Sequence, residues 1–309
     1  MLTFVEPSAA SIHYLKVSPF IASFVGSRAL LSAYELGFIN HLIERRSSNL
    51  TNISKAIGCD YRGTTTLISL LTTTHVLECR NQDYFLSETF FECLPYSDYI
   101  LTKLRFASLL LPDFTTGFST YLTNPSLFRE RSILFSIFDY SLCSSEDPQS
   151  HFQTSLWVRL TSILTKYESR PLLDLLTFSD DENILDIGGN SGALALAICD
   201  KIPNASILVL DLPLVCKLGL ANVLGSDCES RIAFSAFDIR SMQLPFGYSV
   251  HIFKSFLHDW SDEDTLSHLR KSVASLARHG RIIILERIAC PPSDLETHWS
   301  FADLPTLLF

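Results

Sequence analysis

The 309-residue sequence lacks several features that would each mark a class of protein. Its 24 basic residues are outnumbered by 33 acidic ones, and the net charge is −9. This balance argues against proteins that bind nucleic acid through phosphate contacts, because these need a basic face. No apolar run reaches the length of a membrane span, and the first residues carry no basic segment of a signal peptide. We therefore expect a soluble, cytoplasmic protein without nucleic-acid or membrane partners.

The 8 cysteines are scattered, and none form a Cys-x-x-Cys pair or stand at metal-ligand spacing. We expect them to be small buried side chains in a reducing compartment, and we expect no metal site. Hydrophobic residues make up 47% of the chain and charged residues 18%, so a sizeable core can be buried. The length favours two domains.

Residues 18–94 show helical spacing interrupted by short polar breaks. Helices are expected before Gly37 and over residues 40–44, 51–58 and 62–74, and a small hairpin over residues 76–87. This order is the winged-helix pattern, whose usual function is DNA binding. The expected recognition helix has no Lys or Arg after Arg62, so DNA readout is only a remote alternative. We predict a winged-helix-like dimerisation domain over residues 1–94.

Residues 95–180 have the composition of a mostly helical region rich in Phe, Leu and Ser. We expect this region to link the two domains and to shape an apolar pocket that accepts aromatic compounds. The candidate pocket residues are Phe106, Phe114, Phe118, Phe135, Phe138 and Trp157.

After Asp181, strand-like and helix-like segments alternate, which indicates a parallel sheet. Strands are expected over residues 183–187, 206–210, 232–237, 250–254 and 281–286, with helices over 193–201, after Pro213 and over 262–277. The predicted fold class is α/β, with a Rossmann-like doubly wound domain over residues 181–309 preceded by the mostly helical one.

The first strand-to-helix turn, residues 186–192, reads Asp-Ile-Gly-Gly-Asn-Ser-Gly. Glycines there let a ligand approach the backbone at the edge where open α/β sheets bind ligands. Asp211 ends the second strand, where a carboxylate can accept hydrogen bonds from both ribose hydroxyls. The turn lacks the dinucleotide pattern G-x-G-x-x-G, so a nucleoside without pyrophosphate is favoured. The alternative is that the glycines only permit a tight turn.

Three strings carry a resemblance to a known family. They are residues 185–192, residues 210–215 (Leu-Asp-Leu-Pro-Leu-Val) and residues 253–263 (Phe-Lys-Ser-Phe-Leu-His-Asp-Trp-Ser-Asp-Glu). They look like the class II small-molecule O-methyltransferases, the S-adenosylmethionine-dependent caffeate, N-acetylserotonin and polyketide type. Residues 33–38 and 84–87 are similar to that family's winged-helix dimerisation domain. The resemblance implies a homodimer that methylates a hydroxyl of an aromatic or polyketide-like small molecule.

The resemblance also implies roles for single residues. The implied cofactor-binding residues are Gly188 and Gly189 at the methionine part, Asp211 at the ribose, Asp238 and Ile239 at the adenine, and Lys254. His258 matches the general base, and Glu286 matches a carboxylate that orients it. An imidazole suits this role because its ordinary pKa of about 6.5 lets it accept a proton at neutral pH. Asp259 either assists the base or caps the helix that follows.

The sequence departs from the family pattern in two places. Asn190 stands where the family usually has glycine, and its side chain is expected to crowd the cofactor. Family members continue beyond the segment that matches residues 301–309, so closing strands are expected to be absent and a sheet edge exposed. Two alternatives remain open. One keeps the fold and cofactor but performs N- or C-methylation or a non-methylating reaction, and the other is an inactive truncated homologue acting as a dimer partner.

Overall fold

The computed structural model describes residues 18–145 and 147–286, with side chains from residue 25 onward. The chain divides into two compact units, residues 1–108 and 109–309. The finer division at residues 94 and 180 stays a prediction. Among the helices that the structure describes, none is both long and apolar enough to cross a membrane.

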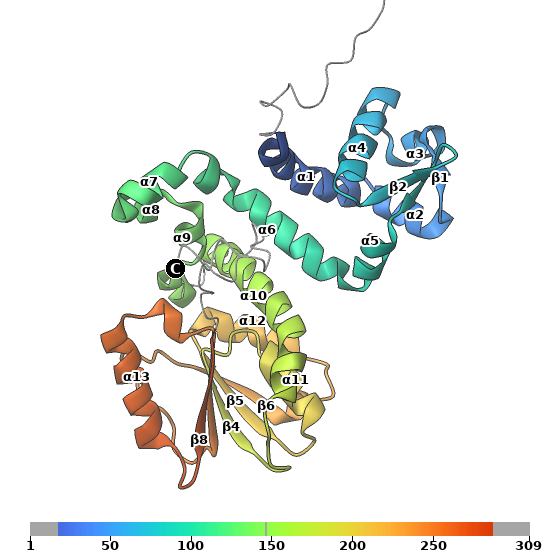
Figure 1. Cartoon of the computed structure of the whole chain (residues 1–309). Coiled ribbons are helices and arrows are strands. Elements are labelled where there is room, and N and C mark those ends of the chain that lie inside the picture. Colours follow the sequence, from blue (N-terminus) through green and yellow to red (C-terminus); the bar gives the residue numbers. More distant parts are fainter. Residues whose placement is uncertain (1–17, 146, 287–309) are drawn as a thin grey trace, which may run out of the picture. The chain divides into compact units, whose positions relative to one another are not determined.

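The first unit packs short helices around a small antiparallel sheet (Figure 1). Its elements are α1 (Ser18–Glu35), α2 (Phe38–Arg45), β1 (Ser48–Asn49), α3 (Leu50–Ile57), α4 (Tyr61–Thr73), β2 (Leu77–Arg80), β3 (Asp83–Leu86), α5 (Glu88–Cys93) and the 3-10 turn η3 (Leu94–Tyr96). The expected hairpin is confirmed as β2 and β3, which pair in antiparallel register. Strand β1 was not expected, because two residues carry no periodicity.

Local signals explain where these helices begin and end. The side chain of Asn49 accepts a hydrogen bond from the Asn52 amide and caps α3, which ends at Gly58 in the left-handed conformation. Asp60 caps α4 in the same way through the Gly63 amide. Residues at helical spacing, such as Leu67 and Leu71, are buried in the core of this unit.

Helix α6 (Ser97–Thr115) contains the boundary between the two units. It is followed by α7 (Phe118–Thr123), α8 (Pro125–Arg131), α9 (Ile133–Ile137), the 3-10 turn η4 (Tyr140–Ser144) and the long helix α10 (Pro148–Asp174). Buried Asp113 accepts hydrogen bonds from the Ser132 hydroxyl and from the Leu134 amide at the start of α9. Asp147 caps α10 by accepting from the Ser150 amide.

The second unit contains a five-stranded parallel sheet in the order β6-β5-β4-β7-β8. Its elements are β4 (Asn183–Ile187), α11 (Ala193–Lys201), β5 (Ser206–Asp211), α12 (Pro213–Val223), η5 (Glu229–Arg231), β6 (Ile232–Ala236), β7 (Val250–Lys254), η6 (Leu257–Asp259), α13 (Asp262–Ser275) and β8 (Arg281–Leu285). The expected α/β class is confirmed. After β6 the chain returns to pair β7 with β4, so the strand order reverses between these two strands. Ligands bind at such switch points in open α/β sheets.

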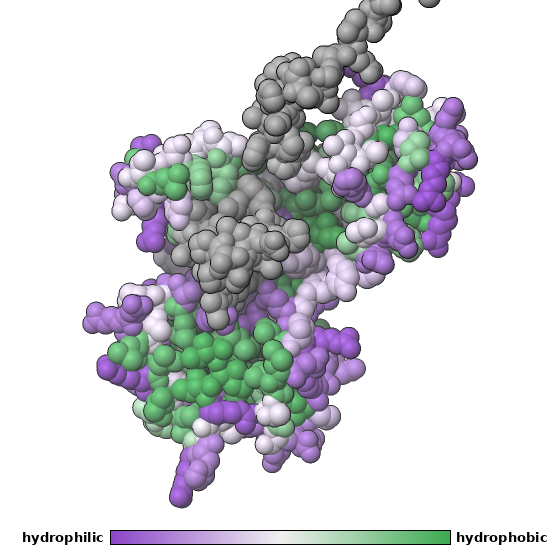
Figure 2. Space-filling model, viewed as in Figure 1, coloured by the Kyte–Doolittle hydropathy of each residue, from purple (hydrophilic) through white to green (hydrophobic). Residues whose placement is uncertain are grey.

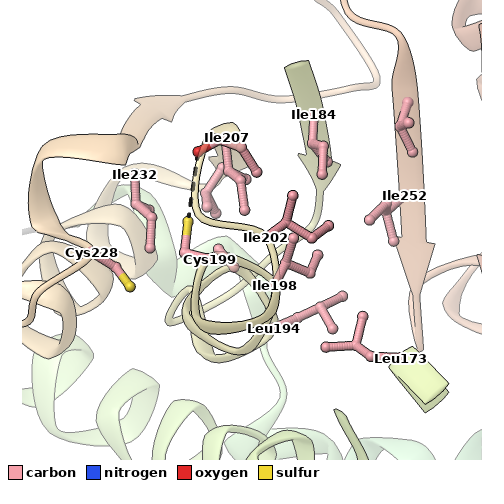
Figure 3. Close-up of a cluster of buried hydrophobic side chains, with 14 of the residues drawn as sticks. Leu173, Ile184, Leu194, Ile198, Cys199, Ile202, Ile207, Cys228, Ile232 and Ile252 are labelled. Carbon is pink, nitrogen blue, oxygen red and sulfur yellow. Dashed lines mark hydrogen bonds between the residues drawn. The ribbon is translucent and has the colours of Figure 1, made fainter. Parts of the chain in front are cut away.

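Side chains alternate between the two faces of this sheet and build a core on each. Ile184, Ile207 and Ile252 pack against Leu194 and Ile198 of α11 on one face, as Figure 3 shows. The other face carries a second cluster, whose buried residues are Leu185, Ile187, Leu210, Phe237, Ile239, Leu244, Phe253 and Leu257. In Figure 1, α13 lies on one side of the sheet and α11 on the other, the layering of a doubly wound domain.

Strand β8 forms one edge of the sheet and, within residues 18–145 and 147–286, pairs only with β7. Ile284 on β8 is 48% exposed. Figure 2 shows apolar surface gathered in this part of the second unit. The expectation about closing strands was drawn from residues 301–309, which lie outside the described residues.

Candidate active site

The glycine turn between β4 and α11 needs its glycines for packing. Gly188 has a left-handed backbone (φ 69°), and a Cβ atom there would overlap the ring of Phe256. A Cβ atom at Gly189 would lie 2.5 Å from Oδ2 of Asp186. The Gly188 amide donates to the carbonyl of Leu210, 2.8 Å away, which brings the turn beside the end of β5. The turn is therefore a crowded backbone surface at the switch point.

Two acids lie at this turn with little access to water. Asp186 is 1% exposed, and its Oδ2 has no hydrogen-bond partner among the described residues. Burial, and then the charge of Asp211, raise the pKa of Asp186 to about 7 against the opposing effect of Lys254. Asp211 accepts hydrogen bonds from the amides of Asn190 at 2.8 Å and Leu212 at 2.7 Å. Burial still raises the pKa of Asp211 to about 6, because it outweighs these two hydrogen bonds.

The two residues expected at the adenine follow β6. The Asp238 carboxylate is held by the Arg240 guanidinium, with Nη2 2.8 Å from Oδ2 and Nε 2.9 Å from Oδ1. Hydrogen bonds from Arg240 lower the pKa of Asp238. The side chain of Ile239 is 4% exposed and belongs to the core cluster on the α13 face of the sheet. Asp238 thus reaches the surface, while Ile239 is part of the core.

Lys254, at the end of β7, is bound to α10. Its Nζ atom lies 2.8 Å from Oε2 of Glu168 and 3.2 Å from the hydroxyl of Thr165. The Lys254 side chain is only 9% exposed, so this ion pair is mostly shielded from water. Lys254 therefore links the sheet edge to α10, a contact that the sequence did not predict.

His258 and Glu286 meet at the same edge, from the loop after β7 and the residue after β8. Nδ1 of His258 lies 2.7 Å from Oε2 of Glu286, while Oε1 accepts from the amides of Phe256 and Leu257 at 2.8 Å each. Burial opposes ionisation of Glu286, but the hydrogen bonds from His258 and the two amides outweigh it and lower the pKa. An ionised carboxylate can only accept, so Nδ1 carries the proton. In the neutral imidazole, Nε2 then holds the lone pair.

Asp259 stands on the other side of the imidazole. Its Oδ1 lies 3.3 Å from Nε2 of His258, and its Oδ2 accepts a 2.7 Å hydrogen bond from the hydroxyl of Tyr140. Burial raises the pKa of Asp259, while His258 and Tyr140 act to lower it. Ser261, not Asp259, caps α13 through the Asp264 amide. Asp259 therefore contacts His258 and does not cap α13.

Tyr140 was not predicted as a functional residue, and it joins an aromatic group beside the site. Its ring meets Trp157 edge-on with centroids 5.5 Å apart, and Phe138 stacks on Trp157 at 5.9 Å. Among the other predicted pocket residues, Phe114 packs on Phe118, and Phe135 packs on Phe128. No local signal marks Tyr140, because its importance comes from a contact 119 residues away in the sequence.

The structure thus gathers most of the candidate residues at the carboxyl edge of β4, β5, β7 and β8. Within residues 18–145 and 147–286, no cluster of three or more His, Cys, Asp or Glu side chains could hold a metal ion. A glycine turn, a neighbouring acid and a carboxylate-held imidazole at one switch point define the class. This is an α/β protein whose glycine turn, of a type that suits a nucleoside, shares a sheet edge with a candidate general base.

Comparison of the sequence with models of protein families identifies the family. An O-methyltransferase domain matches residues 130–308, and an O-methyltransferase dimerisation domain matches residues 19–103. The first match alone spans more than half of the sequence, and the chain belongs to the O-methyltransferase family.

Individual relatives agree with this assignment. The chain is 30% identical over 132 residues to 3-hydroxy-5-methyl-1-naphthoate 3-O-methyltransferase of Streptomyces sahachiroi, covering 43% of the chain and 38% of the relative. Overall, the chain spans less than two fifths of the length of the curated relatives it matches.

Two solved structures show the same fold. The mitomycin 7-O-methyltransferase MmcR has a TM-score of 0.72 at 20% identity, covering 97% of this chain and 87% of that one. NcsB1 from neocarzinostatin biosynthesis was solved with S-adenosylmethionine and 2-hydroxy-5-methyl naphthoic acid. It has a TM-score of 0.61 at 17% identity, covering 84% and 78%.

Proposed function

We propose that the chain transfers a methyl group from S-adenosylmethionine to a hydroxyl of an aromatic or polyketide-like small molecule, with His258 as the general base. The observation that carries this proposal is the His258–Glu286 pair, which fixes Nδ1 at 2.7 Å from the carboxylate and so puts the lone pair of the neutral imidazole on Nε2. A naphthoate enzyme among the relatives and a naphthoic acid bound to NcsB1 support an aromatic hydroxyl as the acceptor.

The residues of the glycine turn fit S-adenosylmethionine. Gly188 and Gly189 would line its methionine part, and the Asp211 carboxylate would accept from the ribose hydroxyls. Oδ2 of buried Asp186, which has no hydrogen-bond partner among the described residues, is an acceptor that suits a cofactor with cationic groups. Asp238 and Ile239 would lie at the adenine, with the Asp238 carboxylate shared with Arg240. Lys254 would contact the cofactor while holding Glu168.

When bound, S-adenosylmethionine would supply a methyl group whose bond to the sulfonium sulfur breaks as the acceptor oxygen bonds to its carbon, with S-adenosylhomocysteine as the leaving group. Nε2 of His258 takes the hydroxyl proton as the acceptor oxygen attacks, because a neutral phenol or alcohol is a poor nucleophile. The resulting imidazolium is stabilised by the carboxylates of Glu286 and Asp259, 2.7 and 3.3 Å from its nitrogens. Holding the imidazole in one orientation also aligns the acceptor oxygen for in-line displacement.

The substitution His258→Gln tests the proposal. Loss of a general base is expected to lower kcat by about 100- to 10,000-fold. We would measure labelled methyl transfer to a panel of phenols and naphthols, with S-adenosylhomocysteine titration calorimetry as the control for an intact cofactor site. Full turnover by this variant would favour N- or C-methylation or another reaction. If the folded wild-type protein binds no S-adenosylhomocysteine, both enzymatic functions are contradicted. The inactive dimer partner is then the remaining alternative.

We also propose that the first unit is a winged-helix-like dimerisation domain and that the protein is a homodimer. The match to a dimerisation domain over residues 19–103 supports this, as does the order of α3, α4 and the β2–β3 hairpin. Light scattering coupled to size-exclusion chromatography is expected to give twice the chain mass of 34.7 kDa. A monomer at micromolar concentration would contradict the proposal.

A further inference from the structure

Asn190, within the glycine turn, makes side-chain contacts that a glycine could not make. Its backbone is left-handed (φ 56°), a conformation that asparagine tolerates better than most residues. Its amide donates to Oδ2 of Asp211, 2.8 Å away, and its own Oδ1 accepts from the Ser191 amide at 2.7 Å. Its Nδ2 donates to the hydroxyl oxygen of Thr161 on α10 at 3.0 Å. The side chain therefore reaches toward α10.

The direction of the Asn190–Thr161 hydrogen bond follows from the other contacts of Thr161. A hydroxyl has one proton, and that of Thr161 is directed to the carbonyls of Trp157 at 2.9 Å and Val158 at 3.1 Å. Its oxygen is left to accept from Nδ2 of Asn190. An oxygen at this position is required for the contact, whereas the methyl group of Thr161 is not.

The same face of α10 touches the sheet edge at further points. Ser162 and Ser191 place their hydroxyl oxygens 2.6 Å apart, one residue along from the Asn190–Thr161 contact. One turn and two turns later, Thr165 and Glu168 bind Nζ of Lys254. Helix α10 is thus attached both to the glycine turn after β4 and to the end of β7. It also carries Trp157, which contacts Tyr140, and the Tyr140 hydroxyl donates to Asp259.

We propose that Asn190 is a positioning residue: its hydrogen bond to Thr161 forms a latch that fastens the glycine turn to α10 and prearranges the cofactor site. The inference rests on the proposed function, since it assigns Asn190 a part in binding S-adenosylmethionine. The latch fixes the turn whose Asn190 amide holds Asp211, so less order has to be gained when the ribose binds. It also couples cofactor binding to the helix that carries Trp157. A glycine at this position would remove this hydrogen bond and leave the contact of Ser191 with Ser162 between the turn and α10.

Titration with S-adenosylhomocysteine separates a latch from a crowding side chain. Asn190→Gly and Thr161→Val are each expected to weaken binding about threefold to tenfold, the range that one neutral side-chain hydrogen bond spans. Thr161→Ser keeps the accepting oxygen and is expected to bind as the wild type does. The double variant Asn190→Gly with Thr161→Val is expected to bind no more weakly than either single variant, because both remove the same contact.

Hydrogen exchange provides a readout that a general loss of stability would not reproduce. In the wild type, S-adenosylhomocysteine is expected to slow exchange in the glycine turn and in residues 157–168 of α10. In Asn190→Gly at saturating ligand, the slowing is expected to remain in the turn, while the slowing around residue 161 of α10 is expected to be smaller than in the wild type. Binding by Asn190→Gly as tight as the wild type or tighter would overturn the latch and support crowding. If the folded wild type itself binds nothing, the proposed function fails as well, and the two failures are distinguished.

Discussion

Two loops follow the neighbouring strands β4 and β7, and each is held by an acidic side chain that accepts hydrogen bonds from its backbone. After β4, the amide of Asn190 is bound by the carboxylate of Asp211 from the end of β5. After β7, the amides of Phe256 and Leu257 are bound by Glu286, which follows β8 on the opposite side. In each case an acid from the next strand accepts backbone hydrogen bonds and fixes a turn that contains a left-handed residue.

The balance of forces on the two acids differs. Burial dominates at Asp211 and raises the pKa to about 6, whereas hydrogen bonds dominate at Glu286 and lower the pKa. Burial weighs more heavily on Asp211 than on Glu286, and Glu286 has a third donor in His258, while Asp211 has only backbone donors in the described residues. Asp211 is therefore able to change its charge near neutral pH, and it lies at a position where a ligand could bind. The lowered pKa of Glu286 keeps it ionised beside His258.

Removing the charge of Glu286 should give the largest effect. In Glu286→Gln the amide group can donate to Nδ1 of His258, which moves the imidazole proton to Nε2 and leaves no base there. We expect kcat to fall by about 100- to 10,000-fold, close to the loss of the base itself. Labelled methyl transfer measures this, and Glu263→Gln, in the exposed first turn of α13, is the matched control. Turnover within threefold of wild type would contradict the assigned role.

The substitution Gly188→Ala tests the contact between the two loops. Its Cβ atom would overlap the Phe256 ring of the other loop, and the backbone is left-handed. We expect Gly188→Ala to reduce the free energy of unfolding by about 2–4 kcal/mol, from overpacking and backbone strain together. Gly225→Ala is the control, because Gly225 is also left-handed (φ 79°) but has nothing within 4 Å. That variant is expected to lose only about 1–2 kcal/mol. Equal losses in urea unfolding would show that the loops are not packed tightly at this point.

Much of this arrangement could be predicted because its signals are local. The strands over residues 183–187 and 250–254 were placed at their observed bounds, since short apolar runs ended at polar turns. Parallel strands share one carboxyl edge, so motifs that follow different strands were expected to meet there. The structure brings His258 to Glu286 in this way. Strand β6 ends one residue earlier than expected, at Ala236, although the Phe237 amide still donates to the carbonyl of Asp211 on β5.

The contacts of α10 could not be predicted, because they depend on how a helix docks on the sheet. Glu168 and Lys254 are 86 residues apart in sequence, and Thr161 and Asn190 are 29 apart. In the sequence, Thr161 and Thr165 are polar residues on a helix with no motif around them. The sequence predicts that the Asn190 side chain crowds the cofactor. The direction of that side chain is set by its hydrogen bond to Thr161 on α10, which the sequence does not reveal. Interactions of this kind come from tertiary packing and leave no periodicity to detect.

The pH dependence of cofactor binding gives the smallest effect and tests the titratable acid directly. Asp211 has to be ionised to accept from ribose hydroxyls, and its raised pKa means that it gains a proton as the pH falls through about 6. S-adenosylhomocysteine binding measured by calorimetry is therefore expected to weaken below that pH, by up to about tenfold per pH unit for one proton taken up. Binding is expected to level off at higher pH, once the acid is ionised. Asp211→Asn is expected to bind weakly at every pH, with a flatter profile. If the affinity of Asp211→Asn falls with pH as steeply as that of the wild type, another group takes up the proton. Asp186 is then the first group to test, because its pKa is raised to about 7.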